Sequence, residues 1–149
     1  MKSESIKTTA TLFGLLTAIT LSPAQAHDDK DPRHIAMASL GKNMKAIKKG
    51  LKAGGITPDL LVSAKEIEEV SSRLVSLFPK GPQQPDSRAR PEIWTDMPGF
   101  KKANGNFRAA AAGLVKALSG TDVATAENAL KQTGKTCGGC HKPYRLPKK

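Results

Sequence analysis

Aromatic residues and cysteines are scarce in this chain. Among its 149 residues there are four Phe, one Tyr and one Trp, and only two Cys. Two cysteines cannot build the disulfide framework of a small secreted domain. The formal net charge is +11, but the lysines and arginines are spread along the whole sequence, without an aromatic stacking platform or a nucleic-acid-binding motif. This composition argues against nucleic-acid binding and favours a solvated basic surface that attracts acidic partners.

The sequence also lacks an apolar run long enough to cross a membrane. The run from Ala10 to Leu21 has about a dozen residues, whereas a membrane-spanning helix needs about 20. Two lysines precede this run and the small-x-small sequence Ala24-Gln25-Ala26 follows it, which is the pattern of a secretory signal peptide. We therefore expect residues 1–26 to be removed after Ala26. The remaining 27–149 would form one periplasmic domain with no stable membrane anchor.

Both cysteines fall in one motif near the end of the chain, Cys137-Gly138-Gly139-Cys140-His141. C-x-x-C-H is the attachment sequence of a c-type haem. Two thiols three positions apart lie about one helical turn apart, so both can form thioethers with the vinyl groups of one porphyrin. The histidine is then carried to the iron as its proximal ligand, and the two glycines leave the porphyrin room. The motif predicts one covalent haem c.

Three other interpretations of the motif are weaker. A thioredoxin-like redox dithiol requires a βαβ context, and no strand pattern occurs nearby. A structural zinc site needs two more ligands, and the other histidines, His27 and His34, lie at the far end of the chain. A disulfide that closes so short a loop would contribute little stability. Haem attachment is the interpretation that also gives His141 a role.

Apolar residues recur at helical spacing in four segments, which predicts an all-α, antiparallel up-down-up-down four-helix bundle. The expected helices cover about 32–53, 57–78, 97–119 and 122–145. Thr57, Asp96 and either Thr121 or Asp122 stand where N-caps are needed. The proline-rich stretch 79–93 reads as a crossover loop whose end, at Ile93 and Trp94, packs against the bundle. The third helix would bury one apolar face: Phe100, Ala103, Phe107, Ala110, Leu114 and Leu118.

The function depends on what occupies the sixth position of the iron. The candidates are Met37, Met44, Met97, His34 or no protein ligand. In an antiparallel bundle the start of the first helix lies beside the end of the fourth, so Met37 would lie near the level of His141. Met44 lies two turns deeper, roughly 10 Å along the axis. Spacing alone leaves Met97 as an alternative.

These features together resemble the class II c-type cytochromes of the cytochrome c-prime family, over nearly all of residues 27–149. The position of the haem motif at the C-terminal end is itself distinctive of this class. The resemblance rests on these elements: Arg33-x-x-x-Met37 with Gly41 and Met44, Leu77-Phe78-Pro79, Pro91-Glu92-Ile93-Trp94, and the haem motif followed by Tyr144-Arg145.

The resemblance implies a non-enzymatic electron carrier, with no catalytic residue. In the low-spin branch of the family, the methionine matching Met37 is the distal iron ligand, and LFP…PEIW is closer to this branch. In the high-spin branch the same position only packs over the iron, leaving a pocket for nitric oxide or carbon monoxide. Arg33 and Arg145 would lie near the haem edge. Relatives often form homodimers through their first two helices, and Lys135, Lys142 and Lys148 are candidates to steer acidic redox partners.

Overall fold

The fold was analysed in a computed structural model that describes residues 31–81 and 87–147. The expected signal peptide, residues 1–26, and Lys148 lie outside this part of the chain. None of the helices within the described ranges is both long enough and apolar enough to cross a bilayer. The elements, in order, are α1 Pro32–Ala53, α2 Pro58–Arg73, the 3₁₀ helix η1 Leu74–Leu77, α3 Glu92–Thr95, α4 Met97–Leu118 and α5 Val123–Tyr144.

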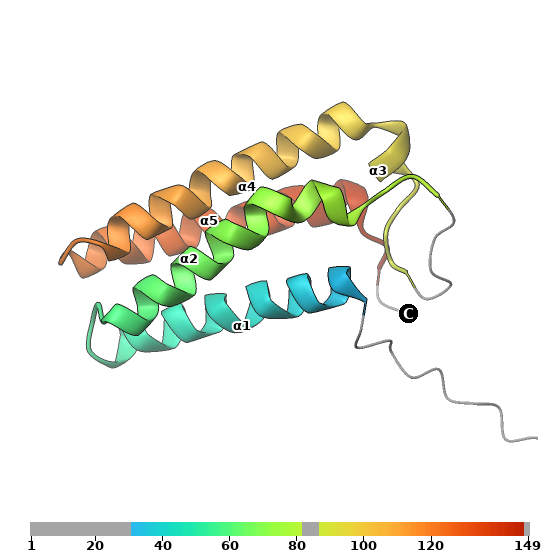
Figure 1. The fold of residues 1–149 in the computed structure, drawn as a ribbon. Coiled ribbons are helices and arrows are strands. Elements are labelled where there is room, and N and C mark those ends of the chain that lie inside the picture. Colours follow the sequence, from blue (N-terminus) through green and yellow to red (C-terminus); the bar gives the residue numbers. More distant parts are fainter. Residues whose placement is uncertain (1–30, 82–86, 148–149) are drawn as a thin grey trace, which may run out of the picture.

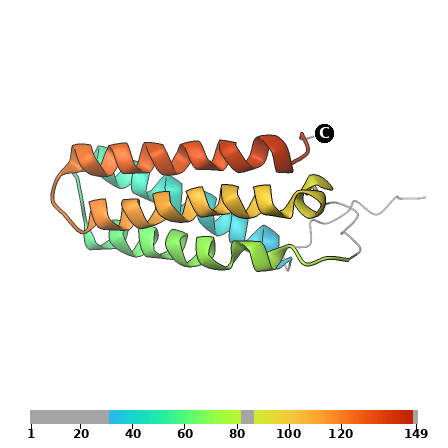
Figure 2. The same cartoon turned by 90° about the horizontal axis from the view of Figure 1, so that it is seen from above.

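The four long helices lie side by side and alternate in direction (Figures 1 and 2). The α1–α2 and α4–α5 turns lie at one end of the bundle. The start of α1, the short helix α3 and the end of α5 lie together at the other end. The predicted all-α antiparallel four-helix bundle is confirmed. Because α5 ends beside the start of α1, the last helical turns of the chain face the first ones.

Three of the long helices begin at an aspartate. Asp31, Asp96 and Asp122 each accept a hydrogen bond from a backbone N–H of the first helical turn, which satisfies one of the free donors there. Asp122, not Thr121, is thus the cap of α5. Thr57 occupies the N-cap position of α2 as predicted, with an extended backbone, but its side chain makes no capping hydrogen bond. Pro58 at the first position of α2 needs no N–H partner.

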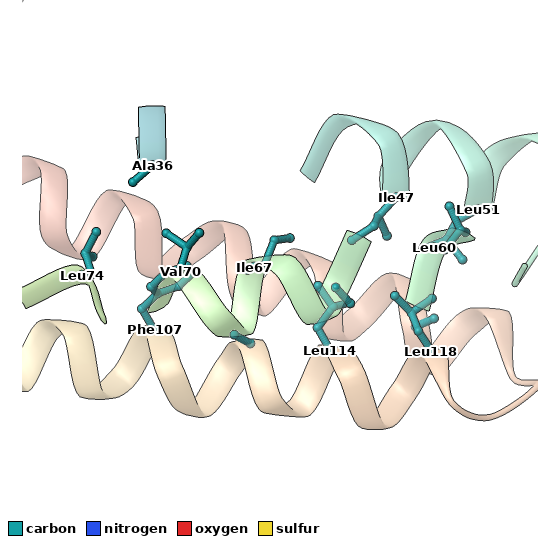
Figure 3. Packing of buried hydrophobic residues seen from close by; sticks show 13 residues of the cluster. Ala36, Ile47, Leu51, Leu60, Ile67, Val70, Leu74, Phe107, Leu114 and Leu118 are labelled. Carbon is teal, nitrogen blue, oxygen red and sulfur yellow. The ribbon is translucent and has the colours of Figure 1, made fainter. Parts of the chain in front are cut away.

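The main core lies between α1, α2, α4 and α5 (Figure 3). Ile47, Ile67 and Leu114 are completely buried, each from a different helix. Removing each such side chain from water stabilises the fold by roughly 1.5–3 kcal/mol. Exposed lysines cover the opposite face of α1, as expected for an amphipathic helix.

The buried face of α4 differs from the one expected. Asn104 and Ala111 are buried, whereas Ala103 and Ala110 are only half-buried and face the α5 side. Asn104 turns toward α2, where its Nδ2 donates to the carbonyl oxygen of Ser71 at 3.1 Å. This polar contact orients the helix, because a buried amide is costly without a partner.

The described parts of the connection from α2 to α4 include two short helical segments. The α-helical part of α2 ends at Arg73 and continues as η1 instead of running to residue 78. Pro91 precedes the short helix α3, which buries Ile93, and Nε1 of Trp94 donates to the carbonyl of Pro79 at 2.9 Å. The expected packing of Ile93 and Trp94 against the bundle is therefore observed.

Aromatic rings fill the end of the bundle where the connection crosses. Phe100 contacts Phe78 and Tyr144 edge to face, with ring centroids 5.1 and 5.2 Å apart. Such pairs contribute roughly 0.5–1.5 kcal/mol beyond the area that they bury. Ile93, Phe100 and Tyr144 form a second cluster, separate from the main core, which closes the end of the bundle near the C-terminus of α5.

Candidate haem site

The last two turns of α5 carry Cys137, Cys140 and His141. All three side chains are half-buried, and no disulfide joins the two cysteines. Sγ of Cys137 lies 3.7 Å from the carbonyl oxygen of Thr133, one turn earlier on the same helix. A spacing of three residues on a continuous helix carries the two sulfurs along one side of α5. This is the arrangement that two thioether bonds to one porphyrin require.

The electrostatics of the thiols do not suit a redox dithiol. Burial raises the pKa of Cys137 and of Cys140 above that of a free thiol, and the neighbouring Cys137 raises the pKa of Cys140 further. A reactive dithiol needs a lowered pKa, which comes from a helix N-terminus or nearby cations. Within residues 31–81 and 87–147 there is also no group of three metal-ligating side chains that could hold zinc. The structure therefore gives no support to the thioredoxin-like and zinc interpretations.

His141 is prepared to act as a neutral ligand. Burial lowers the pKa of its imidazole, and the positive charges of Arg145 and Arg88 lower it further. A guanidinium nitrogen of Arg145 lies 3.2 Å from Nδ1, which leaves Nε2 as the ring nitrogen for other partners. Metal ions bind the neutral imidazole, so these influences favour the state that an iron ligand requires.

The space beside the motif is open. A Cβ atom added at Gly138 or Gly139 would meet no neighbouring atom within 4 Å, apart from their own helical turn, and the same holds for Gly41 on α1. The absence of side chains at these positions leaves free volume along the surfaces of the two helices. The thiols, the neutral imidazole and this open space fit a haem that is attached through the motif.

Met44 and Gly134 lie at the same level of α1 and α5. Cε of Met44 lies 3.8 Å from the position that a Cβ atom of Gly134 would occupy. The two helices are antiparallel, so equal steps in opposite sequence directions lead to the same level of the bundle. We take seven residues toward the N-terminus from Met44 on α1, and seven toward the C-terminus from Gly134 on α5. Those residues are Met37 and His141. Both methionines are half-buried and pack against the main core.

The other candidates for the distal position lie elsewhere. Met97 is half-buried in the second cluster with Phe100 and Tyr144, at the end of the bundle. His34 is exposed in the first turn of α1. Among the four sequence candidates, Met37 is thus the one that the helix alignment brings level with His141, whereas Met44 lies beside Gly134 and Met97 belongs to the aromatic end.

The two arginines that the resemblance placed near the haem edge have different surroundings. Arg145 lies beside His141, as described above. Arg33 forms an ion pair with Asp31 at 3.3 Å, and its guanidinium lies over the ring of Phe78, 5.8 Å from the centroid. Arg33 therefore joins the start of α1 to the end of η1, while Arg145 acts directly on the imidazole.

Sequence reasoning missed Arg88. Its Nε and a terminal guanidinium nitrogen donate to the carbonyl oxygen of Leu146, at 3.0 and 2.6 Å, and its charge contributes to the lowered pKa of His141. Arg88 belongs to a proline-rich connection without periodicity, so no sequence pattern separates it from the other basic residues. Only its proximity to the end of α5 in the fold indicates a role.

A shallow surface hollow of about 460 Å³ lies between α4 and α5, near their connecting turn. Small residues such as Ala110, Gly113 and Ala117 line much of it, and none of the haem-motif residues does. Lys116 and Asp122 also line this hollow, but Asp122 accepts the N–H of Ala124 as the N-cap of α5.

Comparisons with known proteins agree with the fold and show the family of the chain. The family profile described as Cytochrome C′ matches residues 29–145. Cytochrome c-556 of Agrobacterium fabrum is 31% identical over 151 residues, which cover 99% of each chain. Cytochrome c-554 of Cereibacter sphaeroides is 39% identical over 72 residues, and the match spans 46% of this chain and about half (46%) of that relative.

Solved structures of the same fold include two cytochromes c′. The crystal structure from Rubrivivax gelatinosus has a TM-score of 0.70 and 25% identity, over 76% of this chain and 91% of that one. A nitric oxide complex of a mutant cytochrome c prime from Alcaligenes xylosoxidans has a TM-score of 0.72. The latter covers 78% of this chain and 91% of its own, and at 24% identity its likeness concerns the fold alone.

A four-helix bundle that carries C-x-x-C-H on its last helix defines a helical c-type haem protein. The extent of the family match makes the assignment more specific, and the chain belongs to the cytochrome c′ family. The predicted cofactor, one covalent haem c, follows from this membership.

Proposed function

We propose that this protein carries single electrons in the periplasm, with a haem that Cys137 and Cys140 hold through thioethers. His141 is the proximal iron ligand and Met37 is the distal one. The haem, when bound, supplies the Fe(III)/Fe(II) couple. The protein contributes attachment, two axial ligands and shielding from water, and no residue in this account performs catalysis.

The alignment of Met37 with His141 is the observation that carries the proposal. Met44 lies beside Gly134, and Met37 lies two turns from Met44 toward the end that holds His141. A thioether has no N–H or O–H, so it can face an apolar haem pocket without an unsatisfied donor. Methionine ligation stabilises the ferrous state and raises the reduction potential relative to a second histidine.

Export and partners belong to the same proposal. Residues 1–26 would direct export and be removed after Ala26, because haem c is attached outside the cytoplasm in bacteria. Lys135 and Lys142 are exposed on α5 close to the haem motif, which would attract an acidic redox partner to this side of the bundle.

A homodimer through α1 and α2 is also proposed. Ile35 on α1 and Val62 on α2 are the large apolar side chains that these helices expose most, at 51% and 56%. Both belong to the helix pair through which relatives often associate. Burying them in a symmetric interface would remove apolar surface from water.

The alternative function is a five-coordinate, high-spin haem that binds nitric oxide or carbon monoxide. The observation in its favour is that a protein with this fold forms a nitric oxide complex. In that case Met37 would pack over the iron without binding it, and its half-buried thioether would line the gas pocket. The two functions differ in one bond, between iron and the sulfur of Met37.

Substitution of Met37 tests this bond. Met37→Leu keeps the apolar volume of the side chain and removes the sulfur, so the low-spin haem of the natural protein should become high-spin and bind carbon monoxide. Met44→Leu is the matched control, because Met44 lies two turns deeper against Gly134 and its loss should leave the spin state unchanged. Optical spectra of both variants report the outcome.

Two results would contradict the proposal. A natural protein that is already high-spin, with the Met37→Leu variant unchanged, would favour the gas-binding alternative. The second result is a low-spin natural protein whose far-red methionine–iron band persists in Met37→Leu and disappears in Met44→Leu. This result would identify Met44, and not Met37, as the distal ligand.

A further inference from the structure

The chain immediately after α5 is fixed by a short segment of the α2–α4 connection. The backbone N–H of Arg90 donates to the carbonyl of Tyr144 at 3.1 Å, and the N–H of Leu146 donates to the carbonyl of Arg88 at 2.8 Å. These bonds form an isolated antiparallel bridge, the only β-type pairing within residues 31–81 and 87–147. The bridge holds Arg145 between its two hydrogen bonds.

Arg88 strengthens this bridge with its side chain. Its Nε and a terminal guanidinium nitrogen donate to the carbonyl oxygen of Leu146. The backbone carbonyl of Arg88 also accepts the N–H of Leu146. A planar guanidinium that donates two bonds to one oxygen fixes direction as well as distance. Leu146 is thus bound to Arg88 through both its N–H and its carbonyl.

The bridge determines where Arg145 points. α5 ends at Tyr144, and Arg145 has the extended backbone angles φ −129° and ψ 130°. One hydrogen bond to α5 remains, from the N–H of Arg145 to the carbonyl of His141. Because Arg145 has left the helical conformation, the direction of its side chain depends on the bridge as well as on the helix. In this orientation a guanidinium nitrogen of Arg145 lies 3.2 Å from Nδ1 of His141.

A cation at this position acts on the haem through the imidazole. When Nε2 binds iron, the remaining ring proton lies on Nδ1, so the guanidinium cannot donate there and acts as a positive charge. This charge weakens electron donation from the ring and disfavours Fe(III), which carries one positive charge more than Fe(II).

We propose that Arg88 is a positioning residue, which holds Arg145 against the imidazole of His141 and thereby raises the reduction potential of the haem. The proposal rests on the proposed function in one respect, that His141 binds the iron. It assigns to the proline-rich connection a part in tuning the redox centre, in addition to linking α2 with α4.

The test compares reduction potentials of the holoprotein in two backgrounds. Arg88→Gln removes the side-chain donors on Leu146, and Arg88→Lys keeps the charge with a single donor group. Arg90→Gln is the matched control, because it removes the same charge from the same segment, where Arg90 pairs with Glu92 at 3.0 Å. Each variant is also made together with Arg145→Gln. Amide hydrogen exchange of Leu146 reports the bridge independently of the haem iron.

We expect Arg88→Gln to lower the potential more than Arg90→Gln does, and to accelerate exchange at Leu146. Arg88→Lys should show part of both changes. With Arg145→Gln already present, Arg88→Gln should lower the potential much less, because the residue that it positions is gone. Either of two results would overturn the proposal: equal shifts for Arg88→Gln and Arg90→Gln, or the same shift for Arg88→Gln with and without Arg145.

Failure of this inference is distinguishable from failure of the proposed function. A high-spin natural protein that binds carbon monoxide would refute the His141/Met37 assignment, yet its haem would still have a measurable potential. The comparison among the arginine variants would then remain valid, since it requires only that His141 binds the iron. If Arg88→Gln does not fold, Arg88→Lys, which removes the paired donors but keeps the charge, is compared with and without Arg145→Gln.

Discussion

The hydroxyl of Tyr144 donates a hydrogen bond to Oδ2 of Asp96 across 2.9 Å, joining the end of α5 to the start of α4. The other oxygen of the same carboxylate, Oδ1, accepts the N–H of Gly99 at 3.0 Å and caps α4. The Asp96 carboxylate therefore connects both helix ends, and its partner Tyr144 lies three residues after His141 in the sequence. This contact anchors the turn of α5 that would carry the proximal ligand.

Gly99 is required by this contact. A Cβ atom at position 99 would clash with the Asp96 carboxylate and lie 2.6 Å from the Tyr144 hydroxyl. Gly99→Ala should therefore break the contact and destabilise the protein by about 1–3 kcal/mol, as overpacking does. Gly113→Ala on the same helix is the control, because a Cβ there meets nothing within 4 Å and should stabilise by about 0.5–1 kcal/mol. Urea unfolding measures both, and equal effects would refute this account of Gly99.

Tyr144 should make stability depend on pH in the alkaline range. Burial and the Asp96 carboxylate raise the pKa of its phenol above the ordinary value of 10.0. The unfolded chain ionises near pH 10, so the stabilising effect is complete below that pH and is lost as pH rises through the folded pKa. Between about pH 9 and 12, the midpoint of urea unfolding should fall more steeply in the natural protein than in Tyr144→Phe. Parallel curves would contradict the raised pKa.

Both cysteines should be consumed by haem attachment. They are the only two in the chain, so the denatured holoprotein should titrate no free thiol, whereas the apoprotein should titrate both. Cys137→Ala and Cys140→Ala should each keep the haem through one thioether, and the double variant should hold none covalently. Mass spectrometry of the denatured proteins measures this. A holoprotein with titratable thiols, or without the added mass of haem, would refute covalent attachment.

The sequence was sufficient to predict the bundle and the site motif because both depend on local spacing. Apolar residues at steps of three and four define a helical face, and C-x-x-C-H defines its own chemistry. The level of Met37 relative to His141 also follows, since antiparallel neighbours must align their ends. These features needed no knowledge of distant contacts.

Other features depend on tertiary contacts that no local pattern encodes. Asn104 replaces an expected alanine on the buried face of α4 because the Ser71 carbonyl on α2 accepts its amide hydrogen. Arg88 becomes part of the site because a connection remote in sequence pairs with the chain after α5. Thr57 stands at a helix start without capping it, since propensity indicates a position but not a hydrogen bond.

The central claim is that the haem iron is bound by His141 and Met37, and an optical spectrum of the mature protein tests it most directly. The spectrum is recorded oxidised and reduced, with and without carbon monoxide. The account predicts a low-spin spectrum with the weak far-red band of methionine–iron ligation, unchanged by the gas. A high-spin spectrum that shifts when carbon monoxide is added would contradict the claim and establish an open distal site.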